Sequence, residues 1–107
     1  MGTFDDREKA YENKYAHDQE LEFKAVARRN KLLGLWAAEL MGMSEAESLE
    51  YAKAVVKADF EEAGDEDVFR KIRGDFDARG IEQTDHQIRH KMEQLLEEAR
   101  QQVRAQS

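Results

Sequence analysis

The sequence lacks cysteine and proline, and each absence narrows what the chain can be. Without cysteine there can be no disulfide, no thiolate metal site and no cysteine nucleophile, which suits a protein of a reducing compartment. Without proline, and with much Ala, Glu, Lys, Leu and Arg, helix can follow helix without an imposed break. The sequence therefore predicts an all-α fold.

Long apolar runs are also lacking. No stretch approaches the roughly 20 apolar residues that a membrane-spanning helix requires. The chain opens with the polar segment Thr3 to Glu8 and not with the apolar stretch of a signal peptide. We expect a cytoplasmic protein of one domain that does not insert into a membrane.

Catalytic and metal-binding motifs are lacking as well. There is no Walker loop, GxGxxG, HExxH or recognisable serine nucleophile. The segment from Asp75 to Gly80 mimics the start of a calcium loop, but Arg79 replaces a ligand and His86 stands where the closing glutamate belongs. His86 and His90 share a helical face without an evident third ligand. We expect no enzymatic activity, no metal and no cofactor.

Charge is plentiful, and it is mostly negative. With 24 acidic and 17 basic residues the net charge is -7, which argues against general binding to nucleic acid or anionic lipid. The exception is the basic face of Lys24, Arg28 and Lys31, which recur at i, i+4 and i+7 of a helix. This face is either solvated beside Glu20 and Glu22 or meets an acidic partner.

Glycines and capping residues divide the chain into four helical segments. Gly42, Gly64 and Gly80 each follow an apolar periodic stretch, where glycine readily ends a helix. New helices are expected to start at the capping boxes Ser44-x-x-Glu47 and Thr84-x-x-Gln87, and Asp65 is a candidate cap for the third helix. Short connections favour a compact four-helix bundle with antiparallel neighbours and with the third helix shortest.

Apolar residues with helical spacing define the expected core. Its members are Leu32, Leu33, Trp36, Leu40, Leu49, Ala52, Val56, Phe60, Phe69, Ile72, Phe76, Ile88, Met92, Leu95, Leu96, Ala99 and Val103. Gly34 lies inside the first helical stretch, where it weakens the helix and is expected to let another element approach closely.

Residues 1–17 are poor in apolar side chains. Phe4, Tyr11 and Tyr15 nevertheless fall within about 40° of one another on a helical wheel. A short helix of this kind has little area with which to dock, so we expect a frayed segment that orders on a partner. In the alternative, it extends the first helix and packs on the bundle. The predicted organisation is a mobile segment over 1–17 and a four-helix domain over 18–107.

Four separated blocks, in order, carry a family resemblance. They are Thr3–Ala10, Lys24–Trp36, Ala58–Val68 and Thr84–Arg89. From Thr3 to about Leu96 the chain resembles the zeta subunit family, the ATPase inhibitors of alpha-proteobacterial F-type ATP synthases. The resemblance implies a four-helix protein, peripheral to the inner membrane, that binds the catalytic sector of the synthase and blocks ATP hydrolysis.

The resemblance also implies which segment inhibits. It is the N-terminal one, approximately Thr3 to His17, entering between catalytic subunits and reaching the rotating shaft. The basic residues there suit acidic partner groups, and the aromatic residues suit apolar pockets. The candidate partner-binding residues are Phe4, Asp5, Asp6, Arg7, Lys9, Tyr11, Lys14 and Tyr15.

Two other classes of function stay open at this point. The chain could be a sensor that binds ADP or ATP weakly within its bundle, or a general adaptor unrelated to the synthase.

Overall fold

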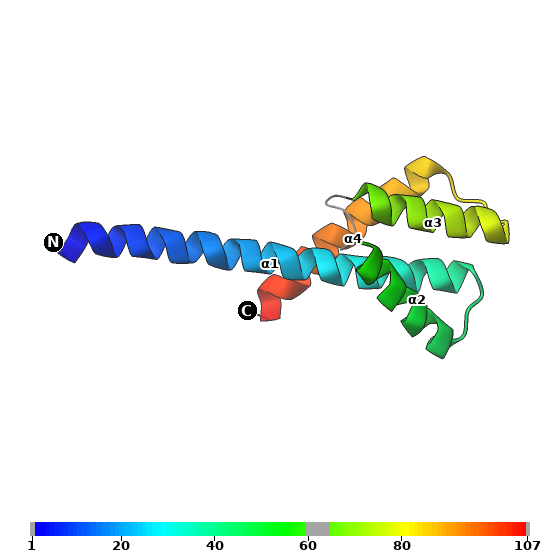
Figure 1. Cartoon of the computed structure of the whole chain (residues 1–107), viewed down its shortest axis with the longest axis horizontal. Coiled ribbons are helices and arrows are strands. Elements are labelled where there is room, and N and C mark those ends of the chain that lie inside the picture. Colours follow the sequence, from blue (N-terminus) through cyan, green and yellow to red (C-terminus); the bar gives the residue numbers. More distant parts are fainter. Residues whose placement is uncertain (1, 60–64, 107) are drawn as a thin grey trace.

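The fold consists of four α-helices. The computed structural model describes the backbone of residues 2–59 and 65–106, and the side chains of residues 17–59 and 65–106. The helices are α1 (Gly2–Leu40), α2 (Glu45–Ala58), α3 (Glu66–Arg79) and α4 (Asp85–Gln106), with no strand in the described ranges (Figure 1). The predicted all-α four-helix class is confirmed.

Local signals end and restart the helices as predicted. Gly42 and Gly80 adopt the left-handed conformation, with φ of 72° and 71°, just after α1 and α3. At the start of α2, the Ser44 hydroxyl accepts from the amide of Glu47 at 3.2 Å, and the Glu47 carboxylate accepts from the Ser44 amide at 3.0 Å. Gly64 lies outside the described residues.

The start of α4 shows the second capping box. The Thr84 hydroxyl accepts from the Gln87 amide at 3.1 Å, and the Gln87 side chain accepts from the Thr84 amide at 2.8 Å. The prediction that the Asp65 side chain caps α3 was wrong. Asp65 occupies the N-cap position but makes no capping hydrogen bond, because its carboxylate binds Arg29 of α1 instead.

The length of α1 determines the shape of the molecule. Its 39 residues, at about 1.5 Å each, give roughly 58 Å, close to the long dimension of 65 Å; the other two dimensions are 24 and 22 Å. The chain reverses direction at each connection, and α2, α3 and α4 surround the C-terminal half of α1 (Figure 1). The third helix is not shortest, because α2 and α3 both have 14 residues.

The helices do not approach one another equally. Both α2 and α4 pack closely along α1, whereas α3 makes fewer close backbone approaches to each of its neighbours. Small buried residues such as Ala37 and Ala52 allow the close packing of α1 and α2. By contrast, α3 contributes the larger Phe69, Ile72 and Phe76, which hold it farther from its neighbours.

The core largely follows the predicted stripes. Its main cluster is formed by the buried residues Leu33, Ala37, Val55, Val68, Phe69, Ile72, Phe76, Ile88, Met92 and Leu95. Trp36 is half-buried against this cluster and meets the Phe76 ring edge-on at 5.6 Å between centroids. Leu40 and Leu49 were wrongly expected inside, because they are 39% and 45% exposed. The predicted Phe60 lies outside the described residues.

Candidate functional site

The predicted inhibitory segment forms the first part of α1. The backbone is helical from Gly2 onwards and passes position 17 without a break. The side chains of the candidate residues lie outside the described side chains; these residues are Phe4, Asp5, Asp6, Arg7, Lys9, Tyr11, Lys14 and Tyr15. Their roles, and the division of the chain at residue 17, therefore stay predictions.

Asp18, Leu21 and Glu22 of α1 lie beside Arg100 and Arg104 of α4, around a small cavity. Leu21 packs against a small cluster that includes the buried Ala25 and Ala99. The guanidinium of Arg100 donates two hydrogen bonds to the Glu22 carboxylate, at 3.0 and 2.7 Å. These hydrogen bonds lower the pKa of Glu22 below its ordinary value. From this point α1 is attached to the rest of the fold.

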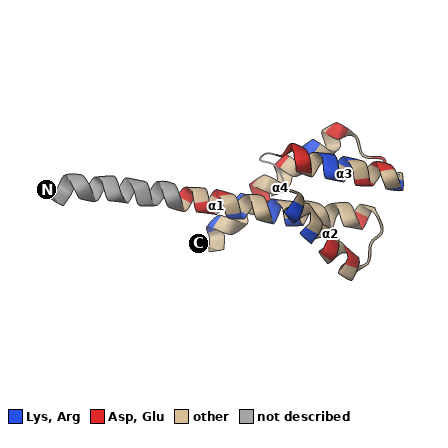
Figure 2. Ribbon diagram, in the orientation of Figure 1, with Lys and Arg blue, Asp and Glu red and all other residues tan. Residues whose placement is uncertain are grey.

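The charge of α1 changes sign just after this attachment. Acidic residues at 18, 20 and 22 are followed by basic residues at 24, 28, 29 and 31 (Figure 2). Lys24 pairs with Glu20 at 3.3 Å, and both side chains are well exposed. Arg28 donates instead to neutral amides of α4, at 2.8 Å to Gln106 and 3.5 Å to Gln102. The basic face therefore borders the end of α4.

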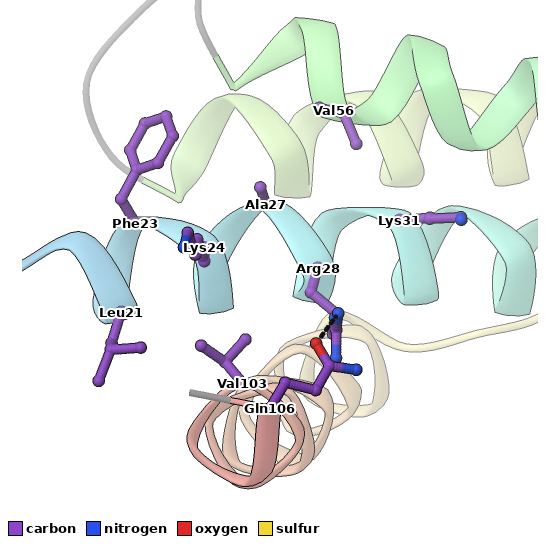
Figure 3. A pocket seen from close by; sticks show the side chains of 9 residues that line it. All are labelled: Leu21, Phe23, Lys24, Ala27, Arg28, Lys31, Val56, Val103 and Gln106. Atoms are coloured by element: carbon purple, nitrogen blue, oxygen red, sulfur yellow. Dashed lines mark hydrogen bonds between the residues drawn. The ribbon is translucent and has the colours of Figure 1, made fainter.

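The basic face lines a groove of about 520 Å³ between α1, the end of α2 and the end of α4. Its lining residues, drawn in Figure 3, are Leu21, Phe23, Lys24, Ala27, Arg28, Lys31, Val56, Val103 and Gln106. A second cavity of about 490 Å³ lies along α2 and is lined by Lys31, Ala46, Leu49, Glu50, Ala52, Lys53 and Val56. The two cavities share Lys31 and Val56.

Arg29 is not part of this basic face. Its side chain is 1% exposed; its Nε donates to the Asn30 Oδ1 at 2.9 Å, and its Nη2 donates to the Asp65 Oδ1 at 2.8 Å. A buried guanidinium joins α1 to the start of α3. Sequence reasoning missed it, although Arg29 lies four residues from both Ala25 and Leu33, in the stripe that enters the core.

The Arg29–Asp65 pair is expected to stabilise the fold. Asp65→Asn should cost about 1 to 3 kcal/mol near neutral pH, because a buried guanidinium then loses its charged partner. The hydrogen bond from Arg29 lowers the pKa of Asp65 below its ordinary value of 3.8. The contribution is thus present above that value and is lost as pH falls through the lowered pKa. Urea unfolding should show that the difference in unfolding free energy between the variant and the unmodified protein becomes smaller as the pH is lowered.

A matched exposed pair provides the control. Glu50 and Lys53 are 3.4 Å apart with both side chains 76% exposed, so Glu50→Gln should change stability by less than about 0.5 kcal/mol. An equal loss for both variants would contradict a special role for Arg29.

Other charged residues singled out from the sequence have structural partners. Asp75 lies on α3, where it accepts from Tyr51 at 2.6 Å and from Lys71 at 3.2 Å. Burial, and then the bond to Asp75, raise the pKa of Tyr51. His86 and His90 are exposed, with their rings stacked at 6.4 Å between centroids. Within the described residues, no three His, Asp or Glu side chains come together as metal ligands.

Comparison with known proteins decides the family. The family described as ATPase inhibitor subunit zeta matches residues 1–102. The chain belongs to this family. The resemblance of the four sequence blocks to the zeta family is thereby confirmed across nearly the whole length.

A solved relative supports the fold of this zeta-family chain. A protein whose solution structure was determined by NMR is 49% identical, with a TM-score of 0.71, over 81% of this chain and 99% of that one. No curated protein matches. In the part of the chain that the structure describes, no helix is both long enough and apolar enough to span a bilayer.

Proposed function

We propose that this zeta-family protein inhibits ATP hydrolysis by the F-type ATP synthase, and that the N-terminal part of α1 is the inhibitory element. The main support is the course of α1. It is one helix from Gly2 to Leu40, and Leu21 and Glu22 attach it to α4 through an apolar cluster and a pair of hydrogen bonds. The proposed inhibitory element, Thr3 to His17, precedes this attachment on the same helix and is therefore continuous with the folded part.

The inhibitory element acts as an anchored wedge. In a helical backbone, positions 4, 11 and 15 fall on one line, so Phe4, Tyr11 and Tyr15 can enter apolar pockets of a single partner surface. Arg7, Lys9 and Lys14 complement acidic groups beside those pockets. A helix lodged between a catalytic subunit and the shaft opposes their relative rotation, because each step would have to expel it.

The proposed partners are the catalytic and shaft subunits of the synthase, and the protein contributes no catalytic group of its own. It works from the cytoplasmic side, peripheral to the inner membrane. Weak adenine-nucleotide binding, considered from the sequence, stays a prediction.

Hydrolysis measured during titration of the matching ATPase with the purified protein tests this proposal. Phe4→Ala, Tyr11→Ala and Tyr15→Ala should each weaken inhibition by about 5- to 150-fold if they are buried anchors. Glu8→Ala, a charged position in the same segment, should have a smaller effect. Unchanged inhibition by all three aromatic variants would refute the assigned anchors, and absence of inhibition by the unmodified protein would refute the function.

A further inference from the structure

We propose that the groove between α1, α2 and the end of α4 binds an acidic amphipathic helix of the partner ATPase. This would be a second contact, separate from the N-terminal segment. The identity of the partner rests on the function proposed above, whereas the acidic and apolar character of the bound helix follows from the residues that line the groove.

The groove carries apolar side chains that are partly exposed. Three large hydrophobic residues are exposed among the described side chains, and two of them, Phe23 at 63% and Leu49 at 45%, line the two adjoining cavities. Leu21, Val56 and Val103 add apolar surface between the helices (Figure 3). Exposed apolar surface gathered in a groove and rimmed by charge is typical of a protein-binding site.

The length of the groove suits a helix better than a small ligand. The first cavity follows α1 from Leu21 to Lys31, and the second follows α2 from Val56 back to Ala46. Since α2 runs antiparallel to α1 (Figure 1) and both cavities are lined by Lys31 and Val56, the second cavity continues from the end of the first. Each spans ten residues of helix, or about 15 Å, so together they could hold several turns of a partner helix.

The charge of the lining predicts an acidic occupant. On a chain with net charge -7, the charged residues of the first cavity are all basic among the residues that the structure describes. The second cavity adds Lys53 and one acid, Glu50, which pairs with that lysine. The partners of the basic face within the fold are weak ones: an exposed carboxylate for Lys24 and neutral amides for Arg28. Carboxylates of a docked helix can replace them with stronger charge-assisted bonds.

The position of the groove links it to the inhibitory element. Its first lining residue, Leu21, follows the end of that element, His17, by four residues on the same helix, or about 6 Å. A subunit that holds the N-terminal segment could therefore also place a helix in the groove.

Site-specific crosslinking identifies the occupant directly. Because the chain has no cysteine, Lys31→Cys gives a single attachment point for a photoreactive label at the junction of the two cavities. After irradiation of the full chain bound to the purified ATPase, mass spectrometry should find an ATPase peptide in which acidic and apolar residues alternate with helical spacing. Arg79→Cys, outside the groove, serves as the control. Crosslinks only to a second copy of this chain, or only to a segment without acids, would overturn the proposal.

Binding affinity provides the second test. Lys31→Glu and Phe23→Ala should each weaken binding of the full chain by about 5- to 10-fold, and the effect of Lys31→Glu should diminish at high salt. Arg79→Glu changes the net charge equally but should leave binding within about 2-fold. Circular dichroism should show the same helical signal for each variant as for the unmodified protein, so that weaker binding does not result from unfolding. If the unmodified protein inhibits and the two groove variants bind as it does, the groove proposal alone is wrong; if the unmodified protein neither binds nor inhibits, the proposed function is wrong.

Discussion

Removal of residues 1–17 should abolish inhibition of the ATPase while the remaining chain keeps its melting transition. The first buried apolar residue described in α1 is Ala25, and the deletion stops before the contacts of Leu21 and Glu22 with α4, so it leaves the described core intact. The same deletion removes all the candidate anchors. We expect a loss of inhibition of at least about 100-fold, because anchor residues usually carry most of the binding energy of an interface.

Two measurements on the truncated chain separate folding from binding. Circular dichroism should show the four-helix signal reduced only by the missing residues, and thermal unfolding should stay within a few degrees of the full chain. Hydrolysis assays should show the ATPase fully active at concentrations where the full chain inhibits. Full inhibition by the truncated protein would move the inhibitory surface to the folded part, with the basic face as the first candidate. Loss of its fold would show that the segment is structural.

Gly34→Ala should destabilise the fold, although alanine is the better helix former. Added at Gly34, a Cβ would lie 2.6 Å from the Cα of Ala52 and 3.3 Å from a methyl carbon of Val55. The first contact is with backbone, so α1 and α2 must move apart to relieve it. We expect a loss of about 1 to 3 kcal/mol, typical of overpacking, instead of the gain that helix propensity alone predicts.

Gly74→Ala is the matched control for this prediction. Gly74 also lies inside a helix, α3, but nothing lies within 4 Å of the Cβ that alanine would add. That substitution should stabilise the protein by about 0.5 to 1 kcal/mol. Urea unfolding at equal protein concentration would compare the two variants. Stabilisation by both would mean that α1 and α2 are not closely packed at Gly34.

Local chemistry was readable from the sequence, and tertiary partners were not. The capping boxes at Ser44 and Thr84, and the glycines after α1 and α3, act through neighbouring backbone, so the helix ends followed from a few adjacent residues. The expected close approach at Gly34 is also confirmed, because a glycine inside a periodic helix has few other uses. The role of Asp65 was predicted wrongly because the partner of its carboxylate, Arg29, lies 36 residues away in the chain, where local sequence gives no sign of it.

The predicted core was wrong where the apolar spacing of a helix is compatible with burial of either of two faces. Leu49 has the correct spacing on α2, but Ala52 and Val55 face α1, which leaves Leu49 at the cavity instead. Arg29 is the opposite case: arginine is usually exposed, but this one is buried because its position on α1 lies in the stripe that enters the core. For the proposed site, the sequence indicated the basic face, but the groove beside it depends on how α2 and α4 meet α1.

The continuity of α1 also changes the free energy with which a partner would bind the proposed inhibitory segment. An isolated peptide of this length must first form a helical nucleus, which the nucleation constants of model peptides set at about 3 to 4 kcal/mol. Here the turns of α1 that pack against α2 and α4 supply that nucleus, so helix need only propagate toward the N-terminus, one residue at a time. The folded part thus serves as a template as well as an anchor. A synthetic peptide with the sequence of the segment alone should inhibit more weakly than the full chain, even with every candidate anchor present.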